Sequence, residues 1–357
     1  MSTKMWKKLL VITLFICLWS CQNSNQVIEY TPNSNFEFAK NITYFEDEHN
    51  IIIDNNGNQL EISKKDLPFS NIMVETTAAI AYLDELEAVN TILGVTDPSF
   101  IYNPSILKKI ASNQVLEVGN SNELYLETIL TNKPQLFIAN SNPTMAKYHE
   151  QLEQNGIKIL YLDEFKETTP LAQAEYLKII GKLIGKEDLA NQKFNQIKNN
   201  YSTTKQLIAE RGKNKVSTLV NTMYGDTWYI PTNISLQAAY IENAKGNYIY
   251  KDLGKEMVSN FTFEEVYTKA KNATHWINVI NYKSLAEMKA ANQNYAWFDS
   301  FKTGNVYNYS NRINSNGAND IFEKGIVRPD LVLKDLGSIF HPELFPNQEL
   351  YFYEKLK

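Results

Sequence analysis

Short apolar runs alternate with longer amphipathic stretches along most of the chain after Pro68. The short runs are typical of buried strands, and the stretches between them, with apolar positions three or four apart, are typical of helices. This alternation indicates parallel βαβ units in a covered sheet. The expected strands of this first region are Ile72–Glu75, Ile92–Val95, Gln135–Ala139 and Ile157–Leu162, and the expected helices are Ala78–Thr91, Pro104–Ala111, Glu123–Thr131 and Pro143–Asn155.

The stretch Pro170–Arg211 carries no strand pattern and interrupts the alternation. Its first helix is expected to end at Ile184, and a second is expected over Glu187–Glu210, which at 1.5 Å per residue gives a rod of about 36 Å. The alternation then resumes, so we expect an α/β protein with two lobes joined by one long helix. The expected elements of the second lobe are the strands Val216–Thr222, Trp228–Ile230, Trp276–Ile280 and Val306–Tyr309 and the helices Leu236–Asn243, Phe263–Ala270 and one opened by Pro329.

The stretch Ile42–Ile62 predicts a β-hairpin before the first lobe. Apolar residues at Ile51–Ile53 and at Leu60 and Ile62 flank an Asn-Gly step, which is a strong hairpin signal. The expected organisation is therefore a signal peptide at 1–20, a lipid-anchored tether at 21–40, an N-terminal lobe at 41–165, bridging helices at 166–212 and a C-terminal lobe at 213–357.

The N-terminus has the pattern of an export signal. Three lysines precede the uncharged stretch Leu9–Trp19, which is shorter than the roughly 20 apolar residues that a membrane-spanning helix needs. It ends in the lipobox Leu18–Cys21, so we expect cleavage before Cys21 and attachment of diacylglycerol to its thiol. The alternative is an ordinary signal peptide with a chance cysteine. We expect a periplasmic protein that lipid at Cys21 anchors to a membrane.

Composition narrows the chemistry of the mature chain. Cleavage removes one of the two cysteines, so no disulfide and no cysteine nucleophile is expected. It also removes three lysines, which changes the formal charge from −5 to −8 and argues against a nucleic-acid partner. The 21 Tyr, 17 Phe and 5 Trp suit a binding cleft. No serine nucleophile motif, HExxH motif or phosphate loop is present, so we expect no catalytic activity.

Short motifs in a fixed order carry a resemblance to a known family. They are Ile92–Asp97, Glu117–Gly119, Leu126–Ile129, Lys133–Ile138, Asn155–Ile157, Ile180–Gly185, Phe261–Val266, Gly304–Tyr307 and His341–Phe345. Together they resemble the periplasmic binding proteins of iron-siderophore, haem and cobalamin importers, whose lobes are bridged by one helix. Gln135 departs from the family's usual Asp, and the tail beyond Phe345 and the segment before Leu60 are longer than the pattern requires.

The resemblance implies a monomeric binding protein that delivers a small chelated metal compound to an ABC permease dimer with its ATPase. A siderophore-type ferric chelate is the ligand we expect. Cobalamin or haem on the same fold is one alternative, and an envelope lipoprotein that binds chelates without a permease is another. An exported enzyme such as a chelatase is the third. The four histidines fall in different expected elements, so we expect no site for a bare metal ion and no resident cofactor.

Candidate ligand contacts follow from topology, because ligands of parallel sheets bind beyond the carboxyl ends of the strands. Arg312 and Arg328 are added because a guanidinium pairs bidentately with chelate oxygens, although a surface salt bridge is the alternative for each. Arg211 is assigned to the dipole of its helix. The other expected contacts are Thr77, Asp97 and Tyr102 in the first lobe and Tyr224, Trp228 and Tyr282 in the second.

Glu127 and Glu264 form the last candidate pair. Each is expected near the start of a helix, where an acid alone would favour the helix dipole. They lie at matching places in the two lobes, and the resemblance implies that such carboxylates dock onto arginines of the permease dimer, one on each subunit.

Overall fold

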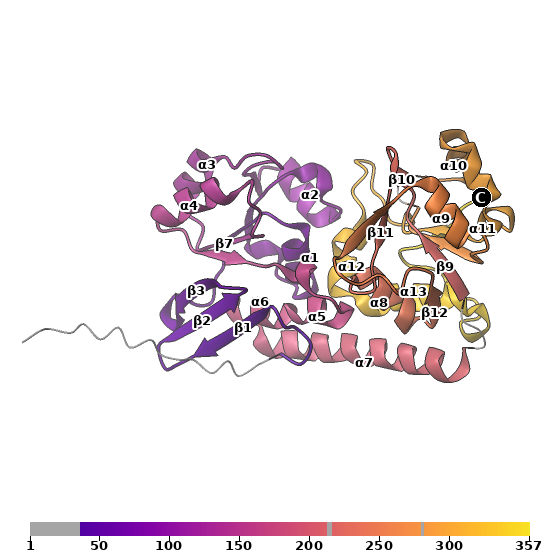
Figure 1. The fold of residues 1–357 in the computed structure, drawn as a ribbon. Coiled ribbons are helices and arrows are strands. Elements are labelled where there is room, and N and C mark those ends of the chain that lie inside the picture. Colours follow the sequence, from indigo (N-terminus) through magenta and orange to yellow (C-terminus); the bar gives the residue numbers. More distant parts are fainter. Residues whose placement is uncertain (1–35, 213–215, 280–281) are drawn as a thin grey trace, which may run out of the picture. The chain divides into compact units, whose positions relative to one another are not determined.

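Two five-stranded sheets form the centres of two α/β lobes in the computed structural model, which describes residues 36–212, 216–279 and 282–357 (Figure 1). In lobe one (up to residue 165) the order β6-β5-β4-β7-β8 is wholly parallel. In lobe two (from residue 216) the order is β12-β9-β14-β15-β16, and only β16 is antiparallel. The expected two-lobed α/β fold is confirmed. The strands are β4 (Ile72–Val74), β5 (Ile92–Val95), β6 (Leu116–Glu117), β7 (Leu136–Ala139), β8 (Ile159–Tyr161), β9 (Val216–Val220), β12 (Gly246–Tyr248), β14 (His275–Ile277), β15 (Val306–Asn308) and β16 (Glu354–Lys355).

Three of the four helices of lobe one are shorter than the periodicity predicts, and α2 has the predicted bounds. They are α1 (Thr77–Glu85), α2 (Pro104–Ala111), α3 (Leu126–Asn132) and α4 (Ala146–Gln154). The helix expected over Ala78–Thr91 already ends at Glu85, because Glu87 takes a left-handed conformation with φ of 54°. The helix expected from Glu123 begins only at Leu126, because the side chain of Asn120 accepts hydrogen bonds from the N–H groups of Asn122 and Glu123 and holds them in a turn.

Lobe two contains more short elements than the sequence pattern predicts. The helices α8 (Leu236–Asn243), α9 (Phe263–Ala270) and α13 (Pro329–Phe340) lie where they are expected. The expected strand at Trp228 belongs to a separate antiparallel sheet, β10-β11-β13. The strand β11 covers Thr227–Pro231. Besides β12 and β16, the α-helices and strands without a sequence-based expectation are β10 (Met223–Tyr224), β13 (Val258–Phe261), α10 (Leu285–Ala291), α11 (Asp299–Lys302) and α12 (Lys324–Val327).

The long helix α7 (Glu187–Arg211) lies where it is expected and packs against both lobes (Figure 1). It follows α5 (Pro170–Glu175) and α6 (Leu177–Leu183), contacts α6 near its start and contacts α13 of lobe two further along. Glycines allow both close approaches. A Cβ at Gly181 would lie 2.3 Å from the Ala190 Cβ, and one at Gly337 would lie 2.7 Å from the Ile208 Cδ1. Larger side chains at these two glycines would push α7 away from the lobes.

The N-terminal sheet consists of β1 (Ile42–Glu46), β2 (Asn50–Asn55) and β3 (Asn58–Ser63), in that order and antiparallel. Its Asn56–Gly57 turn confirms the expected hairpin, with φ of 51° and 89°. The chain just before it is fixed rather than free. Glu175 accepts hydrogen bonds from the N–H groups of residues 37–39, and Glu167 accepts them from residues 40 and 41. Cys21, the expected signal peptide and most of the expected tether lie outside the described residues.

The C-terminal tail completes lobe two. The carboxylate of Asp335 on α13 accepts hydrogen bonds from the N–H groups of Tyr351, Phe352 and Tyr353, at 2.7 to 3.1 Å. These bonds direct the chain into β16, which pairs with β15. The tail beyond Phe345, for which the sequence predicts no role, therefore supplies the edge strand β16 of the lobe-two sheet.

Candidate ligand-binding cleft

Three neighbouring cavities share the side chain of Phe165 and together form the cleft of this molecule. Phe165 follows β8 and is 49 % exposed. The lobe-one cavity, of about 340 Å³, lies at the ends of β4, β5 and β7. The lobe-two cavity, also of about 340 Å³, extends toward α8 and α13, and a side cavity of about 640 Å³ lies over residues 140–143. The cleft thus has walls from both lobes.

The wall of the lobe-two cavity is mainly apolar. Phe322 is 57 % exposed, and Tyr309 packs edge-on against it with ring centroids 5.5 Å apart. Ile321 and Ile326 border the same space. Burial raises the pKa of Tyr309 to about 12, so its phenol stays uncharged at neutral pH. This wall suits the flat or greasy face of a ligand.

The wall of the lobe-one cavity carries several polar side chains, and it lies beyond the carboxyl ends of the strands, where the sequence predicts a ligand. Thr77 and Asp97 border the cavity together with Thr76, Thr96 and Asn140. Burial alone would raise the pKa of Asp97, but hydrogen bonds from Ser121 and Ser99 outweigh it and hold that pKa below its ordinary value. Asp97 is therefore an anion fixed by two hydroxyl groups.

Glu75 borders the same cavity and is paired with a buried histidine. Its Oε2 lies 2.7 Å from Nε2 of His149, whose ring also packs edge-on against Tyr161. His149 thus orients a carboxylate of the cleft from behind. Among the described residues no group of three His, Cys, Asp or Glu side chains is arranged to hold a metal ion.

Glu164 is a cleft residue that the sequence analysis missed. It lies in the 3-10 turn Glu164–Lys166 directly after β8 and borders the lobe-one cavity. Glu164 is only 3 % exposed, and its Oε2 has no hydrogen-bond partner among the described residues. Burial raises its pKa to about 8. The strand-end rule would have found Glu164 had it been applied to the strand expected at Ile157–Leu162.

The two arginines expected to contact ligand are both ion-paired within lobe two. Arg312 Nε lies 2.5 Å from Asp320 Oδ2, and its guanidinium lies 5.2 Å from the centre of the Tyr102 ring. Arg328 makes a bidentate pair with Asp330, with distances of 2.9 and 2.8 Å. Neither arginine borders the three cavities of the cleft. Ligand contact by these arginines and by Tyr102 stays a prediction.

The three expected contacts from lobe two lie apart from the cleft. Trp228 is fully buried, donates its indole N–H to the Val220 carbonyl and stacks on Trp276, so it has no surface for a ligand. The prediction assumed that Trp228 follows a strand of the parallel sheet, but its strand β11 belongs to the small antiparallel sheet β10-β11-β13. Tyr224 is 74 % exposed on β10. Tyr282 borders a separate pocket.

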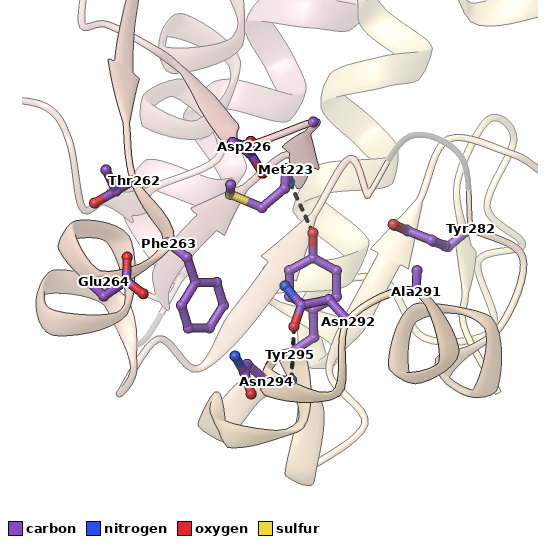
Figure 2. Close-up of a pocket in the computed structure, with 11 residues that line it drawn as sticks. Met223, Asp226, Thr262, Phe263, Glu264, Tyr282, Ala291, Asn292, Asn294 and Tyr295 are labelled. Atoms are coloured by element: carbon purple, nitrogen blue, oxygen red, sulfur yellow. Dashed lines mark hydrogen bonds between the residues drawn. The ribbon is translucent and has the colours of Figure 1, made fainter.

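That separate pocket, of about 560 Å³, shares no bordering residue with the cleft (Figure 2). Figure 2 shows Glu264, Phe263 and Asp226 on one side of it and Tyr282 on the other. The hydroxyl of Tyr295 accepts a hydrogen bond from the Met223 N–H at 3.0 Å and so fixes the floor. We call it the Glu264 pocket.

Glu127 and Glu264 occupy equivalent places in the two lobes. Each is the second residue of its helix, α3 or α9, and each helix leads directly into the strand that pairs with the first strand of its sheet. Both carboxylates are exposed, and neither has an ion-pair or hydrogen-bond partner among the described residues. In Figure 1 both helices lie on the side away from α7. The equivalence expected from the sequence thus extends to topology.

Known proteins share this architecture. A family model described as "Periplasmic binding protein" matches residues 77–312. An uncharacterized lipoprotein of Methanocaldococcus jannaschii is 25 % identical over 298 residues, which cover 81 % of this chain and 69 % of the relative. A possible iron-binding, periplasmic solute-binding protein of Staphylococcus epidermidis superposes with a TM-score of 0.61 at 16 % identity, covering 77 % of this chain and 99 % of the other. The periplasmic vitamin B12-binding protein of Vibrio cholerae gives 0.56 at 15 %, covering 78 % and 99 %.

Proposed function

The chain belongs to the periplasmic binding protein family, and from this premise we propose that it is the lipid-anchored capture component of an ABC importer. In this role it binds a chelated iron compound of the siderophore type and delivers it to a permease dimer with its ATPase. It works as a monomer and without catalysis. The observation that carries this proposal is the cleft around Phe165, which sets an apolar wall from lobe two against a lobe-one wall that carries polar and charged side chains.

The dimensions and lining of the cleft support a chelate rather than a bare ion. Its three cavities have volumes of about 340, 340 and 640 Å³, which lie within the range of pockets that hold drug-sized ligands, and they share Phe165 as a border. Aromatic side chains at Phe165, Phe322 and Tyr309 offer faces for a bulky apolar shell. A bare ion would need several convergent ligands instead.

Delivery to a permease is supported by the equivalent carboxylates of Glu127 and Glu264. They are exposed, free of partners within the described residues and placed on corresponding helices. Two separated anions on a protein surface suit two cations on a partner with two like subunits.

The lipid anchor at Cys21 is supported by the lipobox and by a relative that is itself named a lipoprotein. Cys21→Ser should yield a folded, ligand-competent protein that no longer partitions into detergent. Wild-type protein that carries no diacylglycerol by mass spectrometry would contradict the anchor and leave the cleft unaffected.

Cobalamin is a second candidate ligand, favoured by the apolar wall and by the likeness to the vitamin B12-binding protein; haem on the same fold is a third. The absorbance spectrum of protein purified from its own host decides among them. A ferric chelate, a corrinoid and a haem have distinct visible bands. A colourless protein that binds none of them in a calorimetric titration would contradict the proposed function.

A further inference from the structure

The Oε2 atom of Glu164 is buried and has no hydrogen-bond partner among the described residues. No other residue that borders the cleft has such an atom within the described part of the chain. A buried polar atom without a partner costs free energy, and native proteins retain few of them. Glu164 therefore stands out, because its residue borders a cavity that a ligand would fill.

The protonation state of Glu164 sets the kind of bond that it makes. Burial raises its pKa to about 8, so at neutral pH the carboxyl group holds its proton. A protonated carboxyl has one O–H donor to offer, whereas an ionised one only accepts. A group that fills the lobe-one cavity beside it would thus have to accept a hydrogen bond.

The charges along the cleft disfavour a strongly anionic ligand. Glu75 and Asp97 border the lobe-one cavity with Glu164, and the lobe-two cavity is bordered by no charged residue. Among the described residues Lys166 is the only cation that borders the three cavities, and its Nζ already lies 2.8 Å from Asp163 Oδ2 and 2.8 Å from Ser141 Oγ. An anion placed here would meet carboxylates without a free cation to balance it.

We propose that Glu164 contacts the ligand and donates a hydrogen bond to a carbonyl-type oxygen of an uncharged metal chelate or corrinoid. This rests on the proposed function and narrows it. The accepting oxygen belongs to an amide or hydroxamate, while the apolar part of the same ligand lies against Phe165 and Phe322. Catecholate chelates with several negative charges and haem carboxylates are excluded from this site.

The test is a set of titrations with four probes at pH 7, two uncharged and two anionic. The uncharged probes are ferrichrome and cyanocobalamin, and the anionic ones are ferric enterobactin and haemin. We expect an uncharged probe to bind wild-type protein at least ten-fold more tightly than either anionic probe. Tighter binding of an anionic probe would overturn this inference and leave the proposed function standing. Binding of none of the four would overturn both.

Variants at Glu164 separate a donor from a mere space-filler. Glu164→Gln keeps a donor and should bind the preferred probe within about three-fold of wild type. Glu164→Leu keeps the volume without a donor and should lose about ten-fold, the effect of one hydrogen bond. Melting curves by circular dichroism check that both variants fold. Equal affinities of the two variants would contradict donation by residue 164.

A pH series adds a readout that a structural role would not change. Wild-type affinity should fall between pH 7 and 9 as Glu164 loses its proton, and Glu164→Gln should abolish this fall. Asp335→Asn, at a buried carboxyl outside the cleft, is the matched control and should leave the pH profile of binding unchanged. The same fall in Glu164→Gln would overturn the proposal.

Other titratable groups surround Glu164. They are Asp163 and Lys166 on its own turn, Glu167 after it, Tyr82 on α1, Tyr176 between α5 and α6, and Glu75 and Asp97 across the cavity.

Discussion

The Glu323 carboxylate in lobe two accepts a hydrogen bond from the N–H of Tyr102 in lobe one, at 2.9 Å between Oε2 and N. The N–H of Asn103 reaches the same oxygen at 3.3 Å. Nearby, the Thr77 hydroxyl donates to the Phe322 carbonyl and Asn314 donates to the Ile101 carbonyl. These bonds join the lobes beside the cleft, where α1 packs against α12.

Glu323→Ala should therefore weaken the contact between the lobes. The substitution leaves two N–H groups without their acceptor, so we expect a loss of about 1 to 3 kcal/mol in the free energy of unfolding. Urea denaturation at pH 7 measures it. Glu323→Gln is the control, because its amide oxygen still accepts both bonds, and its loss should be smaller. An alanine variant as stable as wild type would mean that water replaces the carboxylate without cost.

Glu164→Gln should stabilise the empty protein at neutral pH. The pKa of Glu164 is raised by burial to about 8 in the folded state, well above its ordinary value of 4.5. The folded state thus holds a proton that the unfolded state loses between pH 4.5 and 8, so stability falls as pH rises through that window. The amide removes this loss, which amounts to at most about 3 kcal/mol at pH 7. Denaturation at pH 4 and pH 8 should show a gain at pH 8 alone.

Asp335→Ala should release the C-terminal tail from lobe two. Three N–H groups of residues 351–353 lose their shared acceptor, and β16 then loses its anchor on the sheet. We expect a loss of about 3 kcal/mol, with faster amide exchange confined to the tail and β15. Asp335→Asn keeps one accepting oxygen and should lose less. Unchanged amide exchange in the alanine variant would show that the packing of buried Phe352 is enough to hold the tail on the sheet.

Glu127→Lys and Glu264→Lys should each bind chelate as wild type does and fail to support uptake. Each would place a cation against a cation of the permease, and like charges across an interface cost several kcal/mol. Uptake of a radiolabelled chelate at matched expression is the measurement. Glu210→Lys is the control, because Glu210 is an exposed acid on α7, away from α3 and α9 (Figure 1). Normal uptake by both variants would remove the best support for a permease partner.

Ligand should change the radius of gyration very little. The helix α7 forms an ion pair with lobe one through Lys193 and Glu85, and Gly181 and Gly337 seat it closely on α6 and on α13 of lobe two. A hinge motion would have to bend α7 or break these contacts. Small-angle scattering with and without the preferred chelate measures the change, and a large compaction would mean that α7 yields.

Hydrophobic periodicity predicted α7 and seven of the nine parallel strands of the described residues, but neither β6 nor β12. It did not predict β16, whose two residues become a strand only through β15 and Asp335. In the site, the strand-end rule placed Thr77 and Asp97 at the lobe-one cavity. It cannot give burial, so Trp228 was predicted to contact ligand, and Glu164 was missed because the rule was not applied to the strand before it. For Arg312 and Arg328 the sequence left ligand contact and a salt bridge both open, because it does not show that Asp320 and Asp330 pair with them.

The matching positions of Glu127 and Glu264 have a consequence for orientation. Either acid could pair with the same cation on either of two like permease subunits. Rotating the whole protein by half a turn would therefore exchange the subunits that Glu127 and Glu264 contact. Two seatings then satisfy the same pair of charges. Only features that differ between the lobes can tell them apart: β13 of the small antiparallel sheet runs directly into α9, whereas the turn at Asn120 precedes α3.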